Sequence, residues 1–293
     1  MRRSTTSCCS GILLLLAACG GDEGAQDTAA AAPACDSPGQ TYVFVVSVLE
    51  WGRADDATGV SDGFDLDGYD STENDPRGCK IDDYTSPGGE AGIDNGFARV
   101  LPALEMTEAV AVEGLVAQSI ASGDLLVTFE LTGVDDLWND DCVGLSIGRG
   151  GGDALLGTDG MLEEGQTLER DTTLPSTTFQ QVSIVDGQLL ARPLDWSLPL
   201  TIFDVTLDLH LEQGAIRLDI AEDGGVSGVV GGAVDVDYII EVAGSGNIDA
   251  SIVGLMEALL GAYSDLSPDE DGVCQQISIN MQFQTIEAFF FED

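Results

Sequence analysis

Aspartates are concentrated in the stretch VSDGFDLDGYDSTEND, which covers residues 60–75. Carboxylate oxygens are the ligands that Ca²⁺ prefers, and the loops that supply them combine closely spaced acids with glycine. The order Asp65-Leu66-Asp67-Gly68 has this composition. Further aspartates follow before residue 96 and can complete the set of ligands. We therefore predict a calcium site with carboxylate ligands drawn from Asp62, Asp65, Asp67, Asp70, Asp82 and Asp94.

This stretch resembles part of the Asp-rich calcium loops of thrombospondin-type repeats and EF-hands. It departs from the EF-hand pattern because Gly63 would take the first ligand position and Asn74 the twelfth, where EF-hands have Glu. No helix is expected on either side of it. The prediction is therefore an irregular calcium loop, and the alternative is a solvated acidic loop that binds no metal.

Two other patterns could carry chemistry. Gly144-Leu145-Ser146-Ile147-Gly148 matches the G-x-S-x-G elbow of serine hydrolases, but glycines follow it where the elbow requires a helix. His210 is the only histidine and lies in an alternating stretch that is typical of a surface strand. An enzyme is therefore not favoured, and no catalytic residue is assigned. An envelope hydrolase, or a carbohydrate-binding module using Trp51, Trp138 or Trp196, remains the alternative.

Seven cysteines are present, and Cys8 and Cys9 fall within residues 1–18, which are predicted to be removed as a signal peptide. Apart from Cys19, the remaining ones are Cys35, Cys79, Cys142 and Cys274. An even number of cysteines in an exported chain predicts disulfides, here two with three possible connectivities. We predict Cys79–Cys142, with Cys35–Cys274 joining the two ends. The absence of a CxxC spacing and the single histidine argue against a zinc site.

The N-terminus carries Arg2 and Arg3, a short apolar run and then Leu16-Ala17-Ala18-Cys19. The run is too short to cross a bilayer. The pattern resembles the lipobox of bacterial lipoproteins, which implies cleavage before Cys19 and lipid, such as palmitate, on that cysteine. Two acyl chains suffice for stable anchoring. Gly20 follows the cysteine where an Asp would imply inner-membrane retention, so the resemblance favours the outer membrane of the cell envelope.

The charge of the chain limits its partners. Removal of residues 1–18 takes Arg2 and Arg3 from the ten basic residues, which leaves eight against 52 acidic ones, a net charge of about −44. Such a surface repels phosphate, which excludes nucleic acid and leaves membrane attachment to the lipid. The predicted function is a lipid-anchored protein of structural or binding type, with a protein or glycan partner of unknown identity.

The elements that must position these residues are mainly strands. Residues 41–49 are apolar on both faces, whereas residues 205–211 and 277–283 alternate between apolar and polar. Helical periodicity covers residues 97–121 and 248–263. We predict a mainly β fold, an antiparallel sandwich-like arrangement with two packed amphipathic helices, and an α+β fold is the alternative.

The predicted organisation is a signal peptide at 1–18, a flexible tether at 19–40 and a single β-rich domain at 41–293 with a long acidic loop at 52–96. A Gly-rich zone at 150–175 allows a division into two smaller units instead. Segments such as GFDLDGYDS and DGVCQQISINMQF are similar to those of uncharacterised exported lipoproteins of myxobacterial type. This resemblance spans most of residues 60–290 and implies no activity.

Overall fold

The computed structural model describes residues 39–55, 57–106, 112–202, 205–245 and 249–291. These residues all belong to one unit of the chain, Pro33–Asp293. The predicted signal peptide, Cys19 and nearly all of the predicted tether lie outside the described residues.

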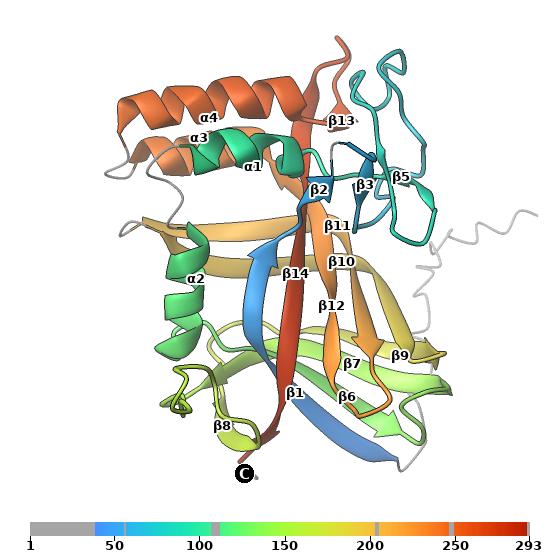
Figure 1. The fold of residues 1–293 in the computed structure, drawn as a ribbon, viewed down its shortest axis with the longest axis vertical. Helices are drawn as coiled ribbons and strands as arrows, with labels where there is room; N and C mark the ends of the chain where they lie inside the picture. Colours follow the sequence, from blue (N-terminus) through green and yellow to red (C-terminus); the bar gives the residue numbers. More distant parts are fainter. Residues whose placement is uncertain (1–38, 56, 107–111, 203–204, 246–248, 292–293) are drawn as a thin grey trace, which may run out of the picture. The chain divides into compact units, whose positions relative to one another are not determined.

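Eight strands form a closed antiparallel β-barrel (Figure 1). Around the ring they are β1 (Gln40–Trp51), β6 (Val127–Val134), β7 (Asp140–Gly151), β9 (Thr177–Val185), β10 (Gln188–Ile202), β11 (Val205–Ile220), β12 (Val226–Asp235) and β14 (Cys274–Phe290). β1 closes the ring by pairing with β14, so that Val43 lies opposite Ala288. The sandwich-like prediction is therefore wrong, because one sheet closes on itself and two sheets do not face each other.

The remaining strands are short. β8 (Gln166–Arg170) runs parallel to the end of β14 and antiparallel to the end of β7, and β13 (Leu266–Pro268) pairs with the start of β14. A separate four-stranded sheet lies within the predicted acidic loop. It consists of β2 (Ala54–Asp55), β3 (Val60–Ser61), β4 (Tyr84–Thr85) and β5 (Ala91–Ile93).

Alternation along the strands separates the barrel interior from its outer face. On β6, Phe129 and Leu131 are 1% and 0% exposed, whereas Glu130 between them is not buried. On β11, Leu209 and Leu211 are buried and His210 between them is not. Each fully buried apolar side chain stabilises the fold by about 1.5–3 kcal/mol relative to exposure. The interior is thus a packed apolar core, and polar sites must lie outside it.

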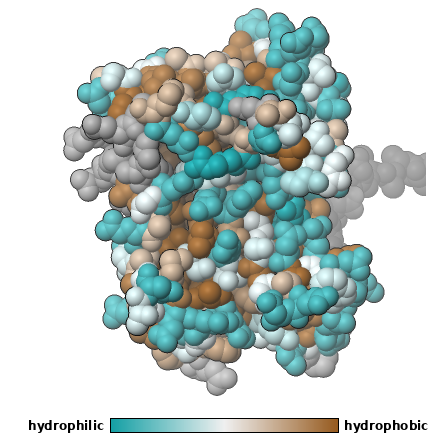
Figure 2. All heavy atoms as spheres, viewed as in Figure 1, coloured by the Kyte–Doolittle hydropathy of each residue, from teal (hydrophilic) through white to brown (hydrophobic). Residues whose placement is uncertain are grey.

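The described residues contain four helices, α1 (Phe97–Glu105), α2 (Val112–Ala121), α3 (Val236–Ser245) and α4 (Ala250–Tyr263), where two were predicted. The periodic stretch 97–121 contains both α1 and α2. Asp249 caps the start of α4, since its carboxylate accepts a hydrogen bond from the Ser251 N–H at 2.8 Å. Its predicted apolar stripe is only partly buried, because Leu260 is the one buried side chain of α4. Figure 2 shows hydrophobic residues over this helix, and others on the middle and lower parts of the same face.

Candidate metal centre

The acidic loop is ordered by its small sheet and by two buried aromatic side chains. Phe64 and Tyr84 are 7% and 4% exposed, and the Asp94 N–H donates to the Phe64 carbonyl at 2.9 Å. This bridge brings Asp94 beside the stretch that contains Asp65 and Asp67, although 27 residues separate Asp67 from Asp94 in the chain.

Asp65, Asp67 and Asp94 form a cluster that can hold a metal ion. One carboxylate oxygen from each lies within 4.8 Å of the others. Asp94 is 2% exposed, whereas Asp65 and Asp67 are half-buried. Three of the six predicted ligands are therefore brought together.

The backbone orients each carboxylate of the Asp65/Asp67/Asp94 cluster through one oxygen. Asp65 accepts from the Gly68 N–H at 2.6 Å and Asp67 from the Tyr69 N–H at 2.8 Å. Asp94 accepts from the Leu66 N–H at 2.7 Å. The second oxygen of each carboxylate has no hydrogen-bond donor among the described residues, so it is available to a cation.

Asn280 of β14 holds the backbone at Asp94 in place. Its amide N–H donates to the Asp94 carbonyl at 2.7 Å, and Asn280 is only 1% exposed. Two glycines make room for this amide: a Cβ at Gly63 or Gly231 would lie 2.5 or 2.0 Å from it. The Gly-rich run of β12 therefore allows close packing against Asn280, the side chain that holds Asp94 in place.

Repulsion between carboxylates is strong at the cluster. The pKa of Asp94 is raised to about 9, chiefly by burial and then by the charges of Asp265, Asp83 and Asp67, against the Leu66 N–H, which lowers it. Burial also raises the pKa of Asp83 to about 7, with contributions from Asp67 and Asp265. The pKa of Asp67 is raised by burial and by Asp65. A bound cation would favour the ionised forms of all these groups.

The other predicted ligands lie elsewhere in the loop. Asp62 accepts hydrogen bonds from Arg217 of β11, with their closest atoms 3.0 Å apart, and so ties the loop to the barrel. Asp70 and Asp82 are exposed. Asp82 accepts from the Glu73 N–H at 2.5 Å, and Asp70 contributes to the repulsion that raises the pKa of Asp83.

Asp265 is the acid that sequence reasoning missed. It follows α4, is 2% exposed and accepts hydrogen bonds from the backbone N–H groups of Gly96 and Ser278 at 3.0 and 2.8 Å. Burial raises its pKa to about 6. Nothing in the local sequence distinguishes it from other aspartates, because its proximity to Asp94 depends on the tertiary fold.

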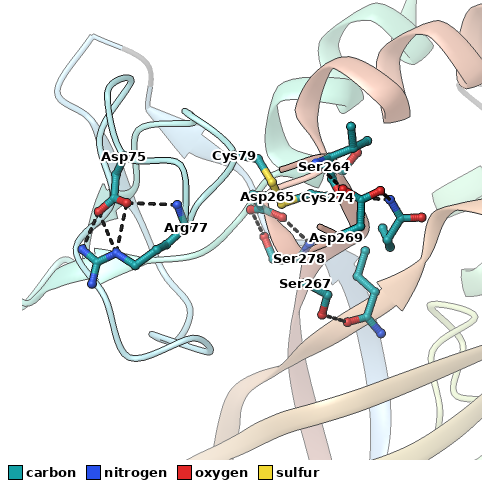
Figure 3. Close-up of a disulfide and its surroundings, with 12 residues drawn as sticks. Asp75, Arg77, Cys79, Ser264, Asp265, Ser267, Asp269, Cys274 and Ser278 are labelled. Carbon is teal, nitrogen blue, oxygen red and sulfur yellow. Dashed lines mark hydrogen bonds and ion pairs between the residues drawn. A yellow bond between two sulfur atoms is a disulfide. The ribbon is translucent and has the colours of Figure 1, made fainter. Parts of the chain in front are cut away.

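A disulfide fixes the acidic loop near Asp265 (Figure 3). Cys79 in the loop is bonded to Cys274 at the start of β14, across a sequence separation of 195 residues. The predicted pairings Cys79–Cys142 and Cys35–Cys274 are therefore wrong, because the loop packs against the β13–β14 turn and not against β7. Cys142 is also disulfide-bonded, and Cys35 lies outside the described residues.

The hydrolase pattern does not form an elbow. β7 runs from Asp140 to Gly151 straight through Ser146, with no helix after it. His210 instead shares a hydrogen bond with Ser197 on the neighbouring strand, with 3.0 Å between Nδ1 and Oγ. Its Nε2 lies 3.5 Å from Asp195, whose side chain is 78% exposed. Ser197 lies opposite His210 in the β10–β11 pairing, and Ser146 of the G-x-S-x-G pattern lies on β7 and is not among these contacts.

Two of the three tryptophans are not free to stack on a sugar. Trp196 is 8% exposed, and Trp51 packs on Phe97 with their ring centroids 5.1 Å apart. Trp138 is 42% exposed and covers Gly187 in the β9–β10 turn.

Comparison of the chain with protein-family profiles, curated proteins and solved structures finds no match. In the described part of the chain, no helix has the length and apolar composition needed to span a membrane.

Proposed function

We propose that the chain is a lipid-anchored protein of the cell envelope, of structural or binding type, whose acidic loop is held on the barrel by a calcium ion. The carboxylate cluster of Asp65, Asp67 and Asp94 carries the calcium part of this proposal. The lipobox ending in Cys19 supports the anchor and favours the outer membrane. The ligand or partner would be a protein or a glycan.

Calcium fits the cluster for two reasons. Its donors are all carboxylate oxygens, which are hard ligands that suit Ca²⁺ better than zinc or copper. The cluster also carries more negative charge than its neighbours balance, since Arg77 is bonded to Asp75 and Arg99 lies over the Tyr84 ring. Calcium would offset this repulsion and keep residues 65–68 against residue 94.

Thermal unfolding of the non-lipidated chain tests this role. At a calcium concentration a hundred times the dissociation constant, binding raises the free energy of unfolding by roughly 2.7 kcal/mol. For a chain of this size we expect the Tm to rise by about 5–10 °C relative to EDTA. Sodium and magnesium at matched ionic strength should give smaller shifts, because general screening of the acidic surface does not need the cluster.

Two double variants separate the site from the surface charge. Asp65→Asn with Asp67→Asn should abolish the calcium shift. Asp159→Asn with Asp223→Asn removes the same charge from exposed turns, where each carboxylate also accepts a hydrogen bond from a backbone N–H. This control variant should keep the calcium-induced rise in Tm. If calcium raised the Tm equally in the two variants, or if every salt raised it equally, the loop would be a solvated acidic surface without a calcium site.

A further inference from the structure

A second candidate site lies on the outer face of the barrel, in a cavity of about 330 Å³ bordered by β6, β7, β8 and the segment after β8. Its floor consists of two cross-strand pairs, Thr128 with Gly148 and Glu130 with Ser146. The residues that alternate with them, such as Phe129 and Ile147, fill the barrel core. The floor is therefore polar and faces away from the interior.

Two arginines, Arg149 and Arg170, border this cavity. Arg170 makes a bidentate pair with Glu130, with N–O distances of 2.7 and 2.8 Å, and lies 3.9 Å from the centre of the Phe290 ring. The charge of Arg149 lowers the pKa of Asp171, after the larger effect of hydrogen bonds from Thr173. Planar, pre-oriented groups of this kind present donors and acceptors in fixed directions.

Several polar groups of the cavity have no partner within the described residues. The hydroxyls of Thr128, Ser146 and Ser176 make no hydrogen bond to another described residue, and the buried Nε of Arg149 has no acceptor. A buried donor without an acceptor costs about 1–3 kcal/mol. A ligand that both donates and accepts hydrogen bonds would satisfy these groups.

The charges around the cavity favour a neutral ligand. Arg149 and Arg170 are balanced by Asp171 and Glu130, and Arg170 is already engaged by Glu130. The chain as a whole has a net charge of −42 and repels anions. A neutral molecule rich in hydroxyl groups matches the remaining donors and acceptors without a charge mismatch.

We propose that this cavity binds a neutral carbohydrate of one or two sugar rings. Its volume lies at the small end of the range for ligand pockets. Gly148 lies in the floor, where a Cβ would make ordinary van der Waals contact with the Thr128 hydroxyl at 3.7 Å and the Ser176 Cβ at 3.8 Å, so a larger side chain would take up space in the cavity. Leu174 and Pro175 add an apolar wall for the C–H face of a sugar. The inference rests on the proposed binding role but not on the calcium site.

Saturation-transfer NMR on the full chain tests this site with methyl glucoside, methyl galactoside, N-acetylglucosamine and the disaccharides cellobiose and chitobiose. We expect transfer to at least one sugar and a loss of affinity of about tenfold or more in Gly148→Leu, which fills the floor, and in Ser146→Val. Ser227→Val makes the same substitution at an exposed position of β12, which contributes no residue to the cavity lining, and should bind as the parent does.

The outcomes are distinct. No transfer to any of the five sugars would overturn the proposal, as would transfer that persists in both cavity variants while their Tm shows them folded. Displacement of the sugar by inorganic phosphate or acetate would indicate an anion site and overturn it too. A calcium shift without sugar binding would contradict only this inference, and sugar binding without a calcium shift would contradict only the metal proposal.

Discussion

Replacing both Cys79 and Cys274 with serine will lower the free energy of unfolding by roughly 5 kcal/mol, in the chain-entropy description of disulfides. The reason is the length of the closed loop, because the two cysteines are separated by 195 residues. Without the bond, the unfolded chain gains the conformations that this loop closure removes. Urea unfolding of the parent and the double variant, both in saturating calcium, measures the difference.

The same double variant should also bind calcium more weakly. The bond attaches residue 79 to the start of β14, where Ser278 holds Asp265 close to the cluster. Ser267→Ala with Ser264→Ala alters neighbouring side chains without opening the loop and serves as the control. A double cysteine variant within about 1 kcal/mol of the parent would mean that the acidic loop is held by its other contacts, such as the ion pair between Asp62 and Arg217.

Without metal, the protein should lose stability as the pH rises from 6 to 9. The folded-state pKa values of Asp83 and Asp94, about 7 and about 9, lie above the unfolded value near 3.9. The native state therefore binds more protons than the unfolded state throughout this window, so the free energy of unfolding falls with pH. The stabilisation is fully present below about pH 4 and is lost as the pH passes each folded-state pKa.

The expected slope is on the order of 1.4 kcal/mol per pH unit for each group that is protonated only in the folded state. Chemical denaturation in EDTA at half-unit steps measures the slope. Saturating calcium should flatten it, because the ion takes the place of the protons. A metal-free stability that stays constant or rises over this window would contradict the raised pKa values of Asp83 and Asp94, which come from burial first and neighbouring carboxylates second.

The strands were readable from the sequence, but their closure was not. Alternation predicted strands over 205–211 and 277–283 because it reports which residues face the core. The second strand is not half-buried as predicted, because its polar residues Ser278 and Asn280 are 0% and 1% exposed and Asn280 packs against the backbone of Asp94. Alternation does not report that β1 pairs with β14, whose partner residues Val43 and Ala288 lie at opposite ends of the chain. A sandwich and a barrel share the same local pattern, so the difference depends on non-local pairing.

α3 shows how one side chain can end a strand inside an apolar run. Residues 234–242 are rich in β-branched residues and predict a strand, but β12 stops at Asp235 and α3 begins at Val236. The Asp235 carboxylate accepts from the Tyr238 N–H at 2.7 Å, the bond that an N-cap makes at a helix start. The capping signal was present in the sequence, and it outweighed the β-propensity of the residues after it.

The candidate metal centre was partly predictable for a similar reason. Asp65 and Asp67 stand out by their spacing, and Asp94 lies in the same acidic loop. The position of Asp265 could not be predicted from the sequence, because only the packing of the segment after α4 against β14 brings it near the cluster. Local sequence pointed to the three aspartates that cluster, whereas their electrostatic environment required the tertiary structure.

Calorimetric titration of calcium into the metal-free chain and into Asp94→Asn tests the central claim most directly. Asparagine resembles the protonated carboxyl that Asp94 carries without metal, so the variant should stay folded and yet lose the ligand charge. We predict saturable binding of one calcium ion to the parent at pH 7.4, with a heat that depends on the buffer because Asp94 releases its proton, and no such binding to the variant. Equal titrations of the two proteins, or a parent titration that magnesium reproduces, would contradict a calcium site at this cluster.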